Sequence, residues 1–271
     1  MTASDGDLAA RACQMYEFFG CLGREVHDLG DGRVVTDPQH PDVWSANKVF
    51  GVRAVTIAAI DVLHSQVDAL LAHLPYRFVV TDVRTPPAYE AYLAMHDFEV
   101  HATTVQMILS GTIRSGERAS SQEVTLDVQP VTSEAQWSAL LDLVLADHAE
   151  GKRTQGATLD RAVSEGMVAG YRSKTPAARY FLGVQDGQPC AYGAGIVGPD
   201  GLGMVEDLYT LPSFRGRGIA SHLIRHCVAY ARTQGCSDIL IGSHVNETPK
   251  HLYQRLGFQP VCVTREYLKR L

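Results

Sequence analysis

The sequence predicts an α/β fold in which strands and helices alternate along most of the chain. Residues 203–210 alternate as a strand does, and residues 219–231 repeat apolar side chains every three or four positions, as a helix does. The turn at residues 215–218, Arg-Gly-Arg-Gly, joins these two segments. Asp186-Gly187 stands between two apolar segments and predicts a hairpin. We therefore expect the two hairpin strands and the strand at residues 203–210 to form one sheet, with the helix at residues 219–231 packed against it.

The first part of the chain predicts three helices and three strands. Apolar side chains recur at helical spacing in residues 5–19 and 60–74, and Pro75 ends the second of these helices. Residues 87–95 predict a third helix. The expected strands are residues 52–54, 78–81 and 98–109.

A polar stretch rich in glycine and serine, residues 110–122, is predicted to link two domains, 1–122 and 123–271. After it, Ser133 and Gln136 form a capping box at the start of a helix. The other elements expected in the second domain are a strand at 124–131, a short helix within 153–172, hairpin strands at 178–184 and 190–197, the strand and helix flanking the turn, a strand at 239–241, a helix ending at Gly257 and a last strand from Phe258.

The composition is that of a soluble globular protein, with 271 residues, 45% hydrophobic and 20% charged. No apolar run reaches the roughly 18 residues that cross a bilayer, and the first residues do not resemble a secretory signal. The six cysteines form no C-x-x-C pair and are expected to be reduced, mostly buried thiols. We therefore expect a cytoplasmic protein with no membrane partner.

The net charge of −6 belongs to the first half of the chain. Residues 1–122 hold 15 acidic and 9 basic side chains, whereas residues 123–271 hold 15 of each. This balance argues against a nucleic-acid partner. The acidic half is either a solvated surface or a field that attracts a cationic amine.

The turn at residues 215–218 predicts an anion site, because it combines glycines, arginines and a helix N-terminus. A P-loop is excluded because Ile219 follows Gly218 where Lys-Ser/Thr is required. A dinucleotide fingerprint fits poorly, because Ser221 replaces its third glycine and Asp238 precedes the next strand. The structural alternative is a solvated basic turn.

Arg215-x-x-Gly218-x-Ala220 resembles the R/Q-x-x-G-x-G/A signature of the GNAT superfamily of acyl-CoA-dependent N-acyltransferases. The resemblance covers roughly residues 123–271 in the family's order of elements, with Asn246, Tyr253 and Gly257-Phe258 matching its Asn…Tyr-x-x-x-Gly-Phe segment. It implies the GNAT fold, a mixed central sheet flanked by helices.

The first half resembles a degenerate copy of the same fold. A shift of 160 positions places Val79-Val80 over Ile239-Leu240 and Phe98 over Phe258. Residues 51–54 lack the R-x-x-G-x-A pattern, so no cofactor site is expected in this copy. The alternative is an unrelated small α+β domain.

The resemblance implies acetyl-CoA as co-substrate and assigns residues to it. The pantetheine arm would pair with the backbone of Leu208, Tyr209 and Thr210, and Asn246 would hold its amide. The pyrophosphate would lie on the turn and the first turn of the following helix, that is Arg215, Gly216, Arg217, Gly218, Ile219, Ala220 and Ser221.

Two residues are predicted to be catalytic. Glu206 would take the proton of the amine, and Tyr253 would protonate the leaving thiolate, with a backbone N–H near Leu208 facing the oxyanion. Strand alternation puts Glu206 and Asp207 on opposite faces, so only one is expected at the site. A structural hydrogen bond and a packing tyrosine are the alternatives. His222 and His226 have the spacing of a metal pair but lack a third ligand, so no metal is predicted.

We expect transfer of an acetyl group to a primary amine of a small molecule, such as an amino acid, a polyamine or an amine antibiotic. The C-terminus has no turn for a final hairpin, so residues 150–175 and the first half are expected to line the acceptor site. Three alternatives remain: a protein amine as acceptor, a non-catalytic acyl-CoA-binding module, and nicotinamide-dinucleotide binding. A monomer and a homodimer are both compatible with the sequence.

Overall fold

A computed structural model describes residues 5–114, 126–155 and 160–271. The chain divides into two compact units, the first made of residues 1–107, 242–250 and 260–271 and the second of residues 108–241 and 251–259. Most of the predicted link lies outside the described residues, and the division into domains 1–122 and 123–271 stays a prediction. None of the described helices combines the length and the apolar character needed to cross a membrane.

The first unit contains a mixed sheet in the order β1-β2-β3-β4-β11. β3 and β4 are parallel because α2 connects them, whereas β1–β2, β2–β3 and β4–β11 are antiparallel pairs. Its elements are α1 (Asp5–Cys21), β1 (Glu25–Asp28), β2 (Arg33–Thr36), β3 (Lys48–Phe50), α2 (Ile57–Leu70), β4 (Tyr76–Thr81), α3 (Pro87–Met95), most of β5 (Glu99–Ser110) and most of β11 (Gln259–Arg270).

One expectation for the first unit was wrong and one hairpin was missed. The strand expected to end at residues 52–54 lies at 48–50, and the β1–β2 hairpin was not predicted. Gly51 follows β3 with φ +64, a left-handed conformation that ends the strand before residue 52.

The second unit contains the mixed sheet β10-β9-β8-β7-β6, in which β9 and β10 are parallel and the other neighbours antiparallel. The predicted hairpin is confirmed, with Asp186 and Gly187 at φ 52 and 78. The capping box is also confirmed, because Ser133 Oγ accepts from the N–H of Gln136 at 3.3 Å. Its elements are β6 (Asp127–Pro130), α4 (Glu134–Gln155), α5 (Arg161–Ser173), β7 (Ala178–Gln185), β8 (Gln188–Val197), β9 (Leu202–Thr210), α6 (Ile219–Thr233), the start of β10 (Asp238–His244) and most of α7 (Pro249–Leu256).

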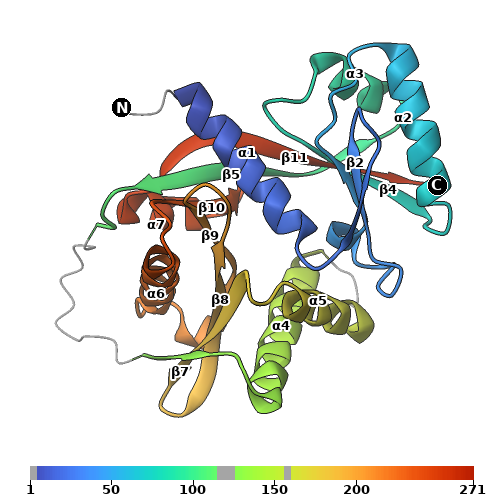
Figure 1. The fold of residues 1–271 in the computed structure, drawn as a ribbon. Coiled ribbons are helices and arrows are strands. Elements are labelled where there is room, and N and C mark those ends of the chain that lie inside the picture. The colour runs from blue at the N-terminus through green and yellow to red at the C-terminus, as the bar shows by residue number, and fades with distance from the viewer. Residues whose placement is uncertain (1–4, 115–125, 156–159) are drawn as a thin grey trace. The chain divides into compact units, whose positions relative to one another are not determined.

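Helices cover both faces of this second sheet (Figure 1). On one face Tyr180 of β7 stacks on Tyr171 of α5, with ring centroids 4.7 Å apart. On the other face the next residue, Phe181, meets His226 of α6 at 4.6 Å. The predicted mixed sheet flanked by helices is confirmed, and its two faces are the α4/α5 face and the α6 face.

Two strands, β5 and β11, each lie beside a strand from the other half of the chain. In the first unit β11 pairs antiparallel with β4, from Arg265–Thr81 to Arg270–Tyr76. In the second unit the end of β5 lies beside β10, and Ser110 Oγ donates to Asp238 at 2.6 Å. This exchange of partners places β11 in the first unit, although β11 comes from the second half of the chain, so the first unit is discontinuous in sequence.

The order of elements agrees with the predicted internal repeat. β5 (Glu99–Ser110) and β11 (Gln259–Arg270) both have 12 residues and begin 160 positions apart. The three elements before each of them, α2, β4 and α3 in the first half and α6, β10 and α7 in the second, follow the same order.

Candidate active site

The predicted anion site lies in the second unit, where the turn after β9 leads into α6. Gly216 and Gly218 adopt φ 78 and 88, and Gly218 is the N-cap residue of α6 without a side-chain capping bond. A Cβ placed on Gly216 would meet no atom within 4 Å, so the turn faces open space. Ile219 is buried, which leaves its backbone N–H as the group it can offer a ligand. This geometry suits an anion at the N-terminus of a 15-residue helix.

The Arg215 side chain is directed at α4. Its guanidinium donates two hydrogen bonds to the carboxylate of Glu150, at 2.6 and 2.7 Å, and its Nε donates to the Thr210 carbonyl at 2.9 Å. The Glu150 carboxylate raises the pKa of Arg215. Both partners are partly exposed, so solvent screens this pair. The sequence did not predict this partner for Arg215, and a phosphate role for Arg215 stays a prediction.

β9 carries a β-bulge opposite Gly193. Tyr192 pairs with Tyr209 and Ala194 with Glu206, so two residues of β9, Asp207 and Leu208, oppose a single residue of β8. Asp207 adopts φ 55, as the extra residue of a bulge can. A Cβ on Gly193 would lie 2.6 Å from Leu208 Cδ2, so only glycine leaves room for the Leu208 side chain there.

The bulge corrects the expectation that Glu206 and Asp207 lie on opposite faces. Glu206 is opposite Ala194, which shares the α4/α5 face with Tyr192 two residues earlier. The Asp207 carboxylate accepts a hydrogen bond from Tyr180 at 2.8 Å, and Tyr180 lies on that same face. Both carboxylates therefore stand on the α4/α5 face, because the bulge interrupts the alternation between them.

Four carboxylates gather on this face, and we call Asp147, Glu150, Glu206 and Asp207 the acidic cluster. Buried tyrosines hold three of them: Tyr180 donates to Asp207 at 2.8 Å, Tyr192 to Asp147 at 3.2 Å and Tyr209 to Glu150 at 3.3 Å. Arg215 donates to the carboxylate of Glu150. Lys174 lies on the same side of the sheet, with its Nζ 5.6 Å from the centroid of the Tyr171 ring. The cluster thus places four acidic side chains on one face of the sheet, and Arg215 pairs with one of them, Glu150.

The tyrosines beside the acidic cluster stay protonated at neutral pH. Burial, followed by the carboxylate of Asp207, raises the pKa of Tyr180 well above its usual value, and burial and Asp147 do the same for Tyr192. Burial and Glu150 raise the pKa of Tyr209 to about 12. These hydroxyls therefore donate to the carboxylates.

Residues 150–175 were expected near the acceptor, whereas Asp147 was missed because a helical aspartate carries no sequence signal of its own.

The backbone predicted to pair with pantetheine lies past the end of a strand ladder. The parallel pairing of β9 with β10 runs from Leu202–Asp238 to Val205–Ile241. Leu208, Tyr209 and Thr210 follow this last pair, on the same strand as the catalytic candidate Glu206. An extended chain can add to a strand edge of this kind.

The remaining predicted site residues are placed as follows. Tyr253 lies on α7 in the second unit, is buried, and has its ring centroid 6.3 Å from that of Phe258. Ala220 and Ser221 lie in the first turn of α6, and Arg217 donates to the Ser213 carbonyl at 2.8 Å. Asn246 is exposed between β10 and α7. It belongs to the first unit, whereas the turn belongs to the second.

The two histidines of α6 have different surroundings. His226 packs edge-on against Phe181 at 4.6 Å, and burial lowers its pKa, whereas His222 is exposed. Within the described part of the chain, no three or more His, Cys, Asp or Glu side chains are grouped as metal ligands.

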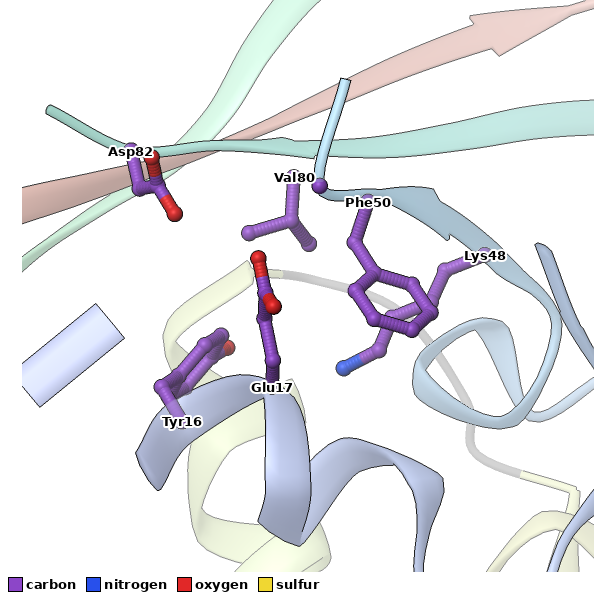
Figure 2. Close-up of a pocket in the computed structure, with 7 residues that line it drawn as sticks. Tyr16, Glu17, Lys48, Phe50, Val80 and Asp82 are labelled. Atoms are coloured by element: carbon purple, nitrogen blue, oxygen red, sulfur yellow. The ribbon is translucent and has the colours of Figure 1, made fainter. Parts of the chain in front are cut away.

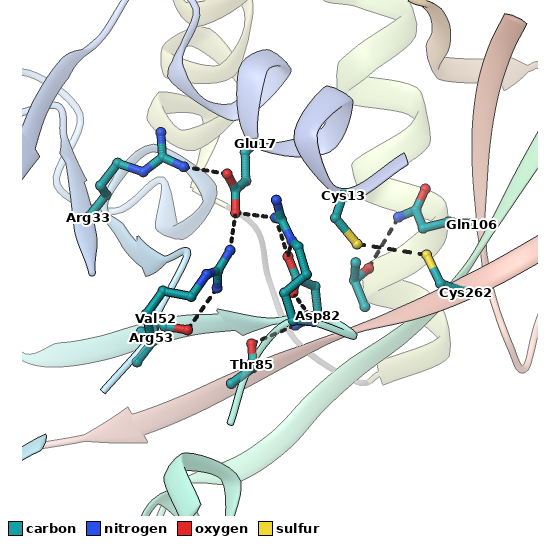
Figure 3. Close-up of polar contacts among 11 residues, drawn as sticks. Cys13, Glu17, Arg33, Val52, Arg53, Asp82, Thr85, Gln106 and Cys262 are labelled. Carbon is teal, nitrogen blue, oxygen red and sulfur yellow. Dashed lines mark hydrogen bonds and ion pairs between the residues drawn. The ribbon is translucent and has the colours of Figure 1, made fainter. Parts of the chain in front are cut away.

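A small pocket in the first unit lies at the repeat-equivalent position of the site strand (Figure 2). Of its lining residues, Lys48 and Phe50 correspond to Leu208 and Thr210 at the offset of 160, and Val80 corresponds to Leu240. Buried Glu17 also lines it and forms ion pairs with Arg33, Arg53 and Arg84 (Figure 3). An ion-pair network thus occupies this part of the first unit, where the sequence lacks the R-x-x-G-x-A turn.

Comparisons with known proteins identify the second half of the chain. Residues 137–258 match the model of the acetyltransferase (GNAT) family. A stretch of 55 residues is 36% identical to the streptothricin acetyltransferase of Streptomyces lavendulae and covers 20% of this chain and 29% of that protein. The chain therefore spans less than a third of that relative's length.

Two solved structures share the fold over most of the chain. A GCN5-related N-acetyltransferase from Kribbella flavida is 16% identical, with a TM-score of 0.66 over 97% of this chain and 95% of that one. A tandem GNAT protein from the clavulanic acid biosynthesis pathway is 10% identical, with a TM-score of 0.60 over 88% of this chain and 78% of that one. At these identities the likeness concerns the fold, which is that of a tandem GNAT protein.

Proposed function

We propose that this protein is an acyltransferase that transfers an acetyl group from acetyl-CoA to a primary amine of a cationic small molecule. The match of residues 137–258 to the acetyltransferase (GNAT) family model supports this proposal. The observation that carries this proposal is the acidic cluster beside the β9 bulge, on the strand that precedes the anion-binding turn.

The residues present fit acetyl-CoA. The open turn at Gly216 and the uncapped N-terminus of α6 suit a pyrophosphate, and the backbone of Leu208–Thr210 suits the amide groups of the pantetheine arm. When bound, acetyl-CoA supplies a thioester with a reactive carbonyl and a thiolate leaving group. A role for Asn246 in holding a pantetheine amide stays a prediction from the sequence.

The acidic cluster prepares the amine. An ammonium group is attracted to the carboxylates, and Glu206 accepts its proton so that the nitrogen lone pair can attack. Asp207 already accepts from Tyr180, which fits a carboxylate that orients the amine and fixes the bulge. Glu206 is therefore proposed as the base and Asp207 as a positioning residue.

Backbone and tyrosine groups complete the proton and charge transfers. A bulge turns backbone N–H groups out of the regular ladder, and the N–H near Leu208 is proposed to donate to the carbonyl oxygen as it becomes negative. Tyr253 is proposed to donate its proton to the departing sulfur. Attack is direct, so no nucleophilic side chain of the protein is required.

A polycationic acceptor is favoured over a free amino acid. The acidic cluster holds four carboxylates, which would repel the carboxylate of an amino acid and attract a second ammonium group. The similarity over 55 residues to a streptothricin acetyltransferase supports an amine acceptor. A protein amine and a non-catalytic acyl-CoA-binding module are the competing functions.

Release of CoA thiol from acetyl-CoA tests this proposal with a panel containing a polyamine, an aminoglycoside, an amino acid and a lysine peptide. We expect kcat/KM to be highest for amines that carry two or more ammonium groups. A preference for the peptide would indicate a protein acceptor. Tight acetyl-CoA binding without turnover of any amine would support the non-catalytic module.

Gly216→Asp tests the anion site, and Gly235→Asp is its matched control. Both glycines have positive φ, at 78 and 93, and a Cβ on either would meet no atom within 4 Å. The first variant places a carboxylate at the N-terminus of α6, whereas the control places one after the C-terminus of the same helix. Calorimetry should show at least roughly tenfold weaker acetyl-CoA binding for the first variant alone. Equal binding by both variants would remove the turn from the cofactor site.

A further inference from the structure

Two cysteines from opposite ends of the chain meet in the first unit. Cys13 lies on α1 and Cys262 on β11, and their sulfur atoms are 3.9 Å apart although 249 positions separate them (Figure 3). Both are free thiols. A disulfide has an S–S distance of about 2.05 Å, so closing this gap needs a sulfur displacement of roughly 2 Å.

Further contacts fix the two elements around this pair. Tyr16, one helical turn after Cys13, donates its hydroxyl to Glu266 Oε1 at 3.3 Å. Thr264, two residues after Cys262, accepts from buried Gln106 of β5 at 3.1 Å. The two thiols are thus held beside each other by neighbouring contacts.

The two thiols differ in exposure and acidity. Cys13 is 1% exposed, whereas Cys262 is only half-buried. The hydrogen bond between the two thiols and the nearby Arg84 lower the pKa of Cys262 against the effects of burial and Asp82, while the same hydrogen bond raises the pKa of Cys13. Cys262 is therefore the thiol that meets an oxidant first, and Cys13 is the thiol that resolves the product.

We propose that Cys13 and Cys262 form a reversible disulfide when the protein meets a peroxide. The Cys262 thiolate attacks one peroxide oxygen, the O–O bond breaks, and Cys262 becomes a sulfenic acid with release of water after proton uptake. Cys13 sulfur then attacks the Cys262 sulfur, the S–O bond breaks, and a second water leaves with the Cys13 proton. Two thiols and one peroxide give one disulfide and two waters, and a dithiol reductant reverses the change.

The bond would close nearly the whole chain into a loop. Because the denatured chain loses most freedom when distant residues are joined, the stabilisation is expected to be near the upper end for disulfides. It would also fasten β11 to the helix that begins the first unit. Oxidation would therefore strengthen the attachment of the exchanged strand.

The test compares wild type with Cys262→Ser and Cys13→Ala, and uses Cys21→Ser as a matched control. Cys21 is the last residue of α1 and is also half-buried and free. Each full-length protein is reduced, treated with hydrogen peroxide at about one equivalent, alkylated, and analysed by intact mass and non-reducing peptide mapping. Thermal unfolding is recorded before and after treatment and after re-reduction.

We expect wild type and Cys21→Ser to lose the mass of two hydrogen atoms, to yield a peptide pair joined through Cys13 and Cys262, and to gain roughly 5–10 °C in Tm. Re-reduction should reverse both changes. Cys262→Ser, whose partly exposed position tolerates serine, should show neither. Oxidation of Cys262 to a sulfinic acid without a crosslink, or a crosslink between another pair, would overturn the proposal.

Discussion

At the scale of single residues, Glu206 and Asp207 share a face but differ in what holds them. The Asp207 carboxylate accepts a hydrogen bond from buried Tyr180, and Asp207 has a positive φ, so this residue helps to form the bulge. Glu206 precedes the bulge and is half-buried on the α4/α5 face. A base must be able to exchange its proton with substrate, which favours Glu206 for that role.

Replacing each carboxylate separates these roles. Glu206→Gln should lower kcat by roughly 10²–10⁴-fold, because the proton acceptor is lost, while acetyl-CoA affinity stays within about twofold. Asp207→Asn keeps an acceptor for Tyr180 and should change KM for the amine more than kcat. Steady-state kinetics and calorimetry measure both. An unchanged kcat for Glu206→Gln would transfer the role of base to another group.

His64 makes the first unit sensitive to mild acid. Burial lowers its pKa to about 4, and its ring accepts from or donates to Tyr89 at 3.2 Å and lies beside Tyr92 and Phe98. The unfolded chain takes up this proton near its ordinary value of about 6.5, so the associated stability is present above that pH and falls as pH drops towards 4.

The variant His64→Gln should therefore lose less stability than wild type between pH 7 and pH 5. His73→Gln is the control, because His73 belongs to the same unit but is exposed. Urea unfolding at both pH values measures the difference. If His64→Gln and His73→Gln show the same pH dependence as wild type, His64 does not carry the effect.

At the scale of elements, the bulge depends on a single residue of the neighbouring strand. A Cβ on Gly193 would lie 2.6 Å from Leu208 Cδ2 and 3.3 Å from Leu223 Cδ2 of α6. The bulge therefore requires a strand residue without a side chain, and Gly193 supplies it.

Gly193→Ala should destabilise the protein by roughly 1–3 kcal/mol through overpacking and should lower kcat/KM by displacing the bulge. Gly187→Ala is a control, since Gly187 lies at the hairpin turn with no atom within 4 Å of its Cβ position. That control should affect stability through its positive φ but leave the kinetic constants unchanged. Equal kinetic losses in both would show that overall stability, not the bulge, sets activity.

Most elements were predictable because their apolar periodicity extends over several turns or strand residues. The hairpin Asp186-Gly187 and the capping box at Ser133 also carried their own local signals. β1 and β2, with four residues each, are too short to show a period, and β1 is almost wholly polar. The bulge was not predictable, because the φ of Asp207 follows from packing against Gly193 and leaves no pattern in β9.

At the scale of the whole molecule, the internal repeat was visible in the sequence but the exchange of strands was not. β5 and β11 have equal lengths and occupy equivalent places in the two halves. Local patterns show that a strand forms but do not distinguish two similar partners for it. The pairing of β11 with β4 is decided by contacts between residues nearly 200 positions apart, such as Arg265 and Thr81.

Removing residues 259–271 should unfold the first unit more than the second, although these residues come from the second half of the chain. β4 would lose the partner that covers it from Tyr76 to Thr81. Hydrogen exchange should show faster exchange of β3 and β4 amides, and a peptide of residues 259–271 should restore their protection. Greater loss of protection in β7 and β8 would contradict the exchange of strands.

The exchange also orders events during synthesis. The first half leaves the ribosome with β4 made, but β11 is translated only after more than 150 further positions. At 5–20 residues per second this interval lasts on the order of 10–30 s. Throughout it β4 has an uncovered edge that invites pairing with other chains. A nascent-chain chaperone, or temporary pairing of β5 with β4, is therefore expected to protect that edge until β11 has been made.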